Sequence, residues 1–213
     1  MKSTFFELAS TRRSIRKFTD KKIPVEDIEY FVNTAITAPS GCNSQCWHFT
    51  AVTSQDLIST ISDAVISATK KFYTSTQLET TDEFLNSRAK STSFFKNAPL
   101  VMFVFTNKVN DYDERVTEFF KAEGHNYRQM MDCLAYPDVL SIGAAIENML
   151  LAIHEKGYGA CWMNDPIIAE KEIKQLLDIQ DDSRLISVIP IGEAAYKPRS
   201  KVLKPLSQIL DIR

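Results

Sequence analysis

Residues 12–17 (RRSIRK) place four positive charges and one hydroxyl group within six residues of a chain whose net charge is −2. Arginine guanidinium groups can bind two phosphate oxygens at once, and a serine hydroxyl supplies a further donor. If this segment is extended, Arg12, Ser14 and Arg16 point to one side, and Arg13 points to the other. The segment therefore predicts a phosphate contact, with a solvated basic turn as the alternative.

A second basic segment, residues 197–206 (KPRSKVLKPL), lies near the C-terminus. Its prolines favour an extended backbone, and the segment predicts a second phosphate contact. The alternative is a tail that packs on the surface through Leu203 and Leu206. The presence of two basic segments, more than either one alone, favours a phosphate contact at each.

Residues 38–49 (APSGCNSQCWHF) form a turn that is rich in amide side chains. Pro39 fixes one backbone angle and Gly41 frees another, so we expect a sharp bend that presents backbone N–H groups. If the chain leaves this turn extended, the amides of Asn43 and Gln45 point to one side and suit the edge of a heteroaromatic ring. The alternative is an ordinary polar loop before a strand.

Residues 159–166 (GACWMNDP) end a strand in a turn, where backbone N–H groups become free to bind a ligand atom. Cys161 has no neighbouring base in the sequence, so we interpret it as a buried thiol and not as a nucleophile. The three histidines are scattered without the spacing of zinc ligands, and we interpret each as structural. The sequence also lacks the P-loop, the G-x-G-x-x-G motif and the G-x-S-x-G motif.

Composition narrows the class of protein. The 213 residues are 44% hydrophobic, which is enough for one substantial core, and we expect one domain over residues 1–213. The net charge of −2 argues against nucleic acid as a partner. Four cysteines without a C-x-x-C pair, and an N-terminus without a secretory apolar block, predict a cytoplasmic protein. The longest apolar run, residues 100–105, is too short for a membrane span.

Hydrophobic periodicity predicts how these segments are positioned. A capping box at Thr4 should begin a short helix that turns Phe5, Leu8 and Ala9 inward. Residues 100–105 should form a central strand that is buried on both faces. Further helices are expected over 25–36, 54–69, 137–156 and 173–177, and further strands over 47–52, 158–163 and 185–191. This order lacks the alternation of a doubly wound sheet and predicts a three-layer α+β fold.

Two excursions interrupt this pattern, at about residues 70–93 and 107–136. Long excursions in a compact domain are usually functional or disordered, and we expect both to be lids over a site. The helix predicted over 137–156 has one small face, formed by Gly143, Ala144 and Ala145, which permits close packing within a subunit or against a second copy.

Taken in this order, the segments resemble the nitroreductase family of FMN-dependent oxidoreductases over nearly the whole chain. Residues 12–18 resemble its phosphate-binding motif, 38–47 its flavin-edge loop, and 157–164 the strand and turn beneath the isoalloxazine ring. Lys201 resembles its tail lysine. The resemblance implies an α/β/α fold with a mostly antiparallel central sheet, FMN as cofactor, and NADH or NADPH as electron donor.

Residue by residue, the resemblance implies three groups of flavin contacts. The phosphate and ribityl contacts would be Arg12, Arg13, Ser14, Arg16 and Lys201. The loop from the partner subunit would supply Pro39, Ser40 and Gly41, with Asn43 and Gln45 close behind. The strand and turn beneath the ring would supply Cys161, Trp162, Met163 and Asn164, with the backbone N–H of Met163 or Asn164 bonded to flavin N5.

The resemblance further implies a homodimer with FMN at the subunit interface and a C-terminal arm at about 197–213. Two electrons would pass by ping-pong hydride transfer to a small nitroaromatic, quinone or similar acceptor. Aromatic residues that could select this acceptor are Phe94, Phe95, Phe119, Phe120 and Tyr127. Dehalogenation, azoline dehydrogenation, flavin fragmentation and flavin binding without turnover remain alternatives.

Two positions depart from the family's pattern. Many relatives have small residues where this chain has Asn164 and Asp165, and many have an arginine where it has Leu203. Lys204 or Arg199 could replace that arginine.

Overall fold

A four-stranded antiparallel sheet forms the centre of the protein. The computed structural model describes residues 4–76, 78–107, 114–180 and 182–213. The strands are β1 (Trp47–Val52), β2 (Leu100–Thr106), β3 (Gly159–Ala160) and β4 (Arg184–Gly192), in the spatial order β1-β2-β4-β3. Every residue of β2 is buried, so the apolar run 100–105 is the central strand that the sequence predicts.

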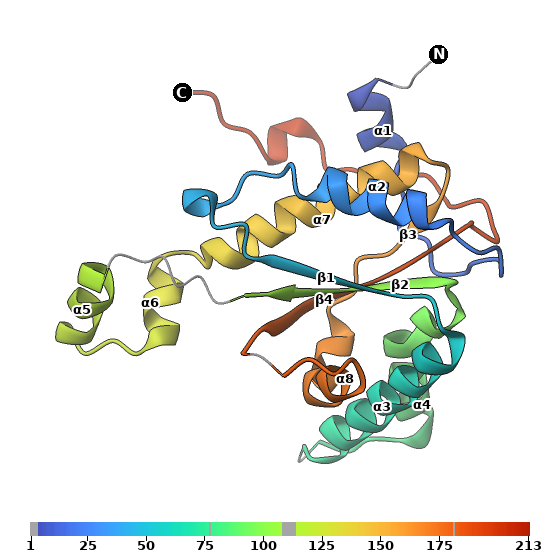
Figure 1. Ribbon diagram of the computed structural model, residues 1–213, viewed down its shortest axis with the longest axis horizontal. Helices are drawn as coiled ribbons and strands as arrows, with labels where there is room; N and C mark the ends of the chain where they lie inside the picture. The colour runs from blue at the N-terminus through green and yellow to red at the C-terminus, as the bar shows by residue number, and fades with distance from the viewer. Residues whose placement is uncertain (1–3, 77, 108–113, 181) are drawn as a thin grey trace.

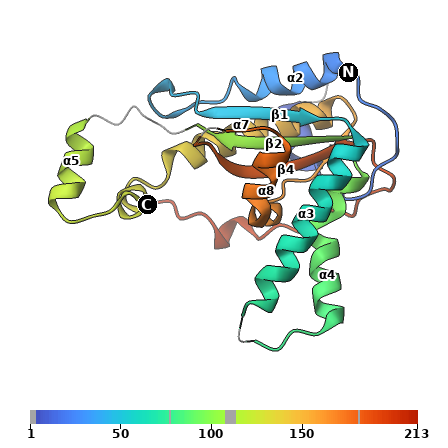
Figure 2. The same cartoon turned by 60° about the horizontal axis from the view of Figure 1, so that its bottom comes forward.

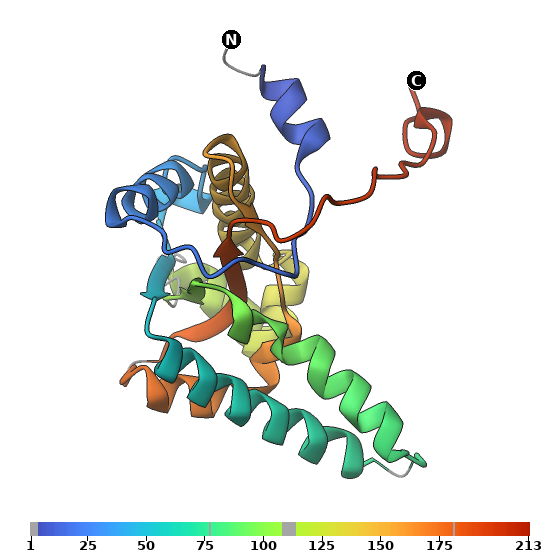
Figure 3. The ribbon, with the colours of Figure 1, turned by 90° about the vertical axis from the view of Figure 1, so that its right-hand side faces the viewer.

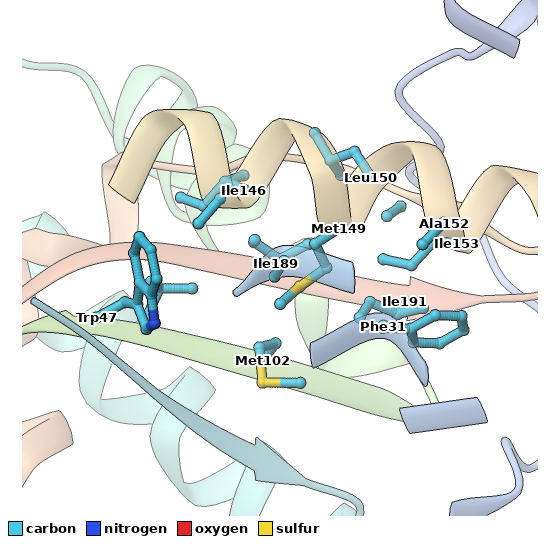
Figure 4. Close-up of a cluster of buried hydrophobic side chains, with 14 of the residues drawn as sticks. Phe31, Trp47, Met102, Ile146, Met149, Leu150, Ala152, Ile153, Ile189 and Ile191 are labelled. Atoms are coloured by element: carbon cyan, nitrogen blue, oxygen red, sulfur yellow. The ribbon is translucent and has the colours of Figure 1, made fainter. Parts of the chain in front are cut away.

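Helices cover both faces of this sheet (Figure 1). On one face lie α2 (Val25–Ala35) and α7 (Pro137–Glu155), and on the other α3 (Gln55–Thr74), α4 (Asp82–Ser93) and α8 (Glu170–Leu176). Side chains of β2 alternate between two cores because successive residues of a strand face opposite sides. Met102 packs with α2 and α7 (Figure 4), whereas Phe103 packs with α3 and α8. The predicted three-layer α+β fold is confirmed.

Local signals explain where several helices begin and end. The α1 helix (Phe5–Thr11) starts at the predicted capping box of Thr4 and Glu7. The Ser54 side chain accepts the Leu57 N–H at the start of α3. The α7 helix has Pro137 in its first turn, where the missing N–H costs nothing, and Gly157 follows it with a φ of 83°.

The prediction that α1 turns its apolar residues inward was wrong. Phe5 is 75% exposed, Ala9 is also exposed, and only Leu8 is half-buried. The capping box stabilises the helix locally without requiring an apolar surface to receive it. In Figure 3, α1 and the C-terminal tail, which includes the 3₁₀ turn η4 (Leu206–Gln208), both extend away from the body of the protein.

The predicted strand 158–163 is shorter than expected, since only Gly159 and Ala160 form regular pairs with β4. The Cys161 N–H still donates to Pro190 O at 3.3 Å. Pro190 cannot donate in return because proline has no N–H, so the ladder stops there. Met163 makes an isolated bridge to Val188, and the chain then turns into the 3₁₀ helix η3 (Asp165–Ala169).

Both predicted lid segments contain helices, which turns and loops connect. The α3 helix continues to Thr74, beyond the point near residue 69 where its apolar pattern fades, and α4 packs antiparallel to it. This α3–α4 hairpin projects beyond the sheet (Figure 2). Rings of Tyr73 and Phe84 meet edge to face across it at 5.1 Å. The second segment contains α5 (Glu114–Ala122) and α6 (Tyr127–Cys133). Residues 77 and 108–113 lie outside the described residues, and the lid role stays a prediction.

The aromatic residues that were expected to select the acceptor differ in exposure. Phe95, in the 3₁₀ helix η2 (Phe94–Asn97), is fully buried and belongs to the core, whereas Phe119 is 60% exposed. The side chain of Tyr127 lies outside the described part of the structure. None of the helices formed by described residues combines the length and the hydropathy needed to cross a membrane.

Candidate functional site

The arginine segment is attached to the edge of the sheet through β3. Ser14 pairs with Ala160 in parallel, and the Ile15 N–H donates to Ala160 O at 2.9 Å. The two backbones approach so closely that a Cβ on Gly159 would lie 2.8 Å from Ile15 Cβ, with Ile15 Cγ1 closer still. Glycine at position 159 therefore permits the contact that positions Arg12, Ser14 and Arg16.

The two basic segments predicted from the sequence form one groove. A cavity of about 510 Å³ lies between residues 12–16 and residues 196–201. Both segments contribute basic side chains to the lining, which contains no aspartate or glutamate. The basic side chains are Arg12, Arg13, Arg16, Lys197, Arg199 and Lys201. Such a groove suits a dianion, because each cation offers donors to phosphate oxygens.

Arginines in this groove are held in place by specific contacts. Arg13 Nη1 donates to Ser10 O and Arg12 O, both at 2.7 Å, and Arg13 Nε donates to Arg199 O at 3.2 Å. Arg13 thereby ties the N-terminal segment to the tail. Arg12 Nε is buried without a hydrogen-bond partner, 3.6 Å from Glu147 Oε1. A buried donor without a partner fits a site whose ligand would satisfy it.

The position of the C-terminal segment shows which residue could replace the arginine that many relatives have where this chain has Leu203. This side chain is 70% exposed and does not line the groove, whereas Arg199 does. Of the two replacements considered for the missing arginine, Arg199 is the one that lies with Lys201, and Lys204 is not in the lining.

His154 lies behind the arginine segment. Its Nε2 atom is 2.9 Å from Thr11 Oγ1, in a smaller cavity of about 170 Å³ that Arg12 and Arg13 also line. Burial lowers the pKa of His154, and the positive charges of Arg12 and Arg13 lower it further. The imidazole is therefore held neutral beside the basic groove.

The turn after Trp162 leaves one of the two candidate backbone donors free. The Met163 N–H donates to Val188 O at 3.0 Å, and Met163 O accepts from Ser187 Oγ at 2.9 Å. The Asn164 side chain donates to Ile186 O at 2.9 Å and anchors the turn. Among the described residues, none accepts the backbone N–H of Asn164, which therefore remains available for a ligand.

Cys161 and Trp162 lie in different surroundings. The Cys161 side chain is buried in the core on the α3 side, and burial raises its pKa, as expected for a structural thiol. Trp162 is 37% exposed. A Cβ on Gly143 would lie 3.5 Å from Trp162 Cη2, so the small face of α7 receives the indole ring.

The sharp bend expected in the loop 38–47 is present, but the extended exit from it was wrong. The chain forms a 3₁₀ turn, η1 (Gly41–Asn43), and Asn43 and Gln45 take φ values of 54° and 45° in place of an extended exit. Serine hydroxyls cause this shape. Gly41 N–H donates to Ser141 Oγ at 3.2 Å, and Gln45 N–H donates to Ser40 Oγ at 3.1 Å. These backbone donors are therefore occupied, while the amide side chains are exposed.

Within one chain, this loop and the basic groove are separate. The loop contacts Ser141 near the start of α7, whereas Thr11 beside the groove contacts His154 near its end. These two positions are about 20 Å apart along the helix axis. No residue of 38–46 lines the groove. The structure thus brings together Arg12, Arg13, Ser14, Arg16 and Lys201, but not Pro39, Ser40, Gly41, Asn43 or Gln45.

Arg88 is a residue that the sequence interpretation missed. Its Nη2 atom lies 3.8 Å from Asp165 Oδ2, and its guanidinium carbon is 5.4 Å from the centroid of the Tyr73 ring. This contact places α4 beside the turn at Asn164. Arg88 and Asp165 are far apart in the sequence, so no local pattern indicates the pair.

Comparison with known proteins places this geometry in context. The chain is 27% identical over 208 residues to iodotyrosine deiodinase of Thermotoga neapolitana, covering 96% of this chain and 95% of that protein. It is 26% identical over 204 residues to YfhC of Bacillus subtilis, which carries the name of an NAD(P)H nitroreductase, covering 96% and 91%.

Solved structures show the same fold. A BluB-like flavoprotein of Clostridium difficile superposes with a TM-score of 0.84 at 26% identity, covering 99% of both chains. An iodotyrosine deiodinase bound to FMN and 3-iodo-L-tyrosine superposes with a TM-score of 0.64 at 25% identity, covering 95% of this chain and 98% of that one. The model of the nitroreductase family matches residues 9–193, and the chain belongs to that family.

Proposed function

We propose that this protein is an FMN-dependent oxidoreductase that takes hydride from NADH or NADPH and reduces a small nitroaromatic, quinone or similar acceptor. The observation that carries this proposal is the basic groove whose Ser14 pairs with β3, the strand that leads into a turn with one free backbone donor. The groove would bind the phosphate of FMN. The Asn164 N–H would donate a hydrogen bond to a nitrogen of its isoalloxazine ring.

Each part of the site has a distinct task in this proposal. Arg12, Ser14, Arg16 and Lys201 bind the phosphate and the ribityl chain, while Arg13 holds the two segments together. When bound, FMN supplies hydride and electron transfer through its N5 atom. The Asn164 N–H would donate a hydrogen bond to that atom, and so would orient the ring and polarise N5 for hydride transfer. Trp162 shields the turn from the side of α7.

We further propose that the active form is a homodimer. Pro39, Ser40 and Gly41 would approach the ring from the partner subunit, with Asn43 and Gln45 behind them, because the loop lies away from its own groove. Exposed apolar side chains at both chain ends, including Phe5 at 75% and Ile212 at 88%, support a covering second copy. Analytical ultracentrifugation should give twice the chain mass of 24.2 kDa. A flavin-loaded monomer that turns over would contradict this part.

The purified protein should be yellow and should keep FMN through gel filtration. Arg16→Ala should lose FMN, whereas Lys71→Ala, which removes an exposed charge away from the groove, should keep it. Anaerobic NADH or NADPH should bleach the flavin, and an acceptor panel should then restore its colour. The proposal fails if the protein takes up no FMN, or if Arg16→Ala binds FMN as tightly as the wild type.

Reductive dehalogenation is a second candidate, which the similarity to the Thermotoga neapolitana iodotyrosine deiodinase favours. The same experiment separates it from the first if 3-iodo-L-tyrosine is included among the acceptors and iodide release is measured. Bound flavin that neither nicotinamide reduces would instead indicate flavin binding without this turnover. Because the proposed donors are cytoplasmic metabolites, we also propose a cytoplasmic location, which cell fractionation would test.

A further inference from the structure

A second basic cavity lies beside the groove, between residues 16–17 and the α3–α4 hairpin. We call it the hairpin cavity. It has a volume of about 510 Å³ and its lining contains no aspartate or glutamate. Five basic side chains line it, from three separate parts of the chain: Arg16, Lys17, Lys70, Lys90 and Lys96. The whole chain has 25 basic and 27 acidic residues, so a lining with five basic and no acidic side chains differs clearly from the average of the chain.

These five cations lack a neutralising partner among the residues that the structure describes. None of them makes an ion pair with any residue in the described part of the chain. Elsewhere on the surface, lysines such as Lys156 and Lys121 lie 2.8 Å from the carboxylates of Asp27 and Glu118. Like charges gathered around a concave surface repel one another and concentrate their field inside it. An anion in the cavity would relieve this repulsion.

The remaining lining suits a phosphorylated organic molecule better than a bare ion. The exposed side chains of Asn86 and Asn97 can supply hydrogen bonds, while Ile66 and the half-buried Phe94 offer an apolar surface. A volume of this size is typical of sites for small organic ligands. Lysine ammonium groups are common phosphate binders because they act as compact point charges.

The hairpin cavity adjoins the proposed flavin site, since Arg16 lines both this cavity and the basic groove. Arg88 fixes the same hairpin to Asp165, next to the turn with the free N–H. We propose that the hairpin cavity binds a phosphoryl group of a molecule whose other end reacts at the flavin. This inference rests on the proposed function. The phosphoryl group could belong to the donor, as the 2′-phosphate of NADPH, or to a phosphorylated acceptor.

The test measures phosphate binding directly, on protein saturated with FMN so that the probe does not enter the groove. Adenosine 2′,5′-bisphosphate and pyrophosphate are titrated by calorimetry. The variant Lys70→Gln/Lys90→Gln removes two charges from opposite helices of the hairpin. Its control is Lys71→Gln, which changes the next residue of α3, where the side chain lines a different surface with Ala64 and Phe72.

We expect the double variant to bind at least one of the two probes about tenfold or more weakly, as for loss of one charge-assisted hydrogen bond, and the control to bind like the wild type. A matching rise in KM for NADPH, with KM for NADH unchanged, assigns the phosphate to the donor. Weaker probe binding with both KM values unchanged assigns it to the acceptor. Either outcome supports the site.

The inference is overturned if neither probe binds the wild type, or if Lys71→Gln weakens binding as much as the double variant. These results are independent of the proposed function, because the titration needs no turnover. Flavin reduction by neither nicotinamide would end the proposed function, and the titration would still show whether the hairpin cavity binds phosphate.

Discussion

The close contact between β3 and the arginine segment makes Gly159→Ala a direct test of how the groove is held. The new Cβ would lie 2.8 Å from Ile15 Cβ, and ordinary contact begins at 3.4 Å, so the segment must retreat by at least about 0.6 Å. This movement would stretch the 2.9 Å hydrogen bond from Ile15 N–H to Ala160 O. Such overpacking costs about 1–3 kcal/mol of stability.

FMN affinity should suffer as well, because Arg12, Ser14 and Arg16 move with Ile15. Weakening one or two charge-assisted hydrogen bonds to phosphate by about 1.4 kcal/mol each lowers affinity about tenfold to a hundredfold. Quenching of flavin fluorescence measures the dissociation constant, and urea unfolding measures the stability of the same samples.

Gly192→Ala is the matched control. Its Cβ would also be crowded, at 2.7 Å from Pro99 Cδ and at 3.0 and 3.1 Å from Phe18 Cδ1 and Cβ, and Phe18 ends the arginine segment but does not line the groove. It should cost similar stability and leave FMN affinity much closer to that of the wild type. The reasoning is refuted if folded Gly159→Ala binds FMN within twofold of the wild type, or if Gly192→Ala loses affinity equally.

Three further predictions concern stability. Phe103→Ala should lower the free energy of unfolding by about 3–5 kcal/mol in urea titrations, since the ring is fully buried, and Phe103→Leu should cost clearly less. Arg184→Gln should cost about 1–2 kcal/mol because it leaves the buried Asp138 carboxylate without its 3.2 Å partner; equal stability would show that the pair contributes nothing. The pKa of His154 is lowered in the folded state, so the unfolded chain binds a proton at this residue first as the pH falls. The free energy of unfolding should therefore be highest above about pH 6.5, the pKa of an unperturbed histidine, and should decrease as the pH falls through the folded pKa. His154→Gln should flatten this part of the pH profile in thermal unfolding, and an unchanged slope would contradict the assignment.

Much of the fold could be predicted because its elements carry their own local signals. The run at 100–105 could only be a central strand, and Pro137 and Gly157 delimit α7. The exposure of α1 could not be predicted, because a capping box indicates where a helix starts but not whether its apolar side chains pack against another element. The early end of β3 depends on Pro190, which lies on another strand.

The candidate site divides in the same way. The two basic segments were recognisable because like charges repeat within a few residues, and the structure places them in one groove. The extended exit expected for the loop at 38–47 was wrong because the loop's conformation depends on the hydrogen bond that the Gly41 N–H donates to the hydroxyl of Ser141, one hundred residues away. The family resemblance left two candidates for the backbone N–H that bonds flavin N5, those of Met163 and Asn164. The structure distinguishes them, because the Met163 N–H already donates to Val188 O and the Asn164 N–H does not have an acceptor among the described residues.

The α3–α4 hairpin extends beyond the sheet, and its outer part is held by contacts between its own two helices, such as Tyr73 with Phe84. Its inner part meets the core through Ile58, Ile61 and Val65. Substitutions near the tip can therefore accumulate without disturbing the sheet or the flavin groove. Exchanging the tip would therefore test the predicted lid role, because the entry of ligands should change while the sheet and the basic groove stay intact.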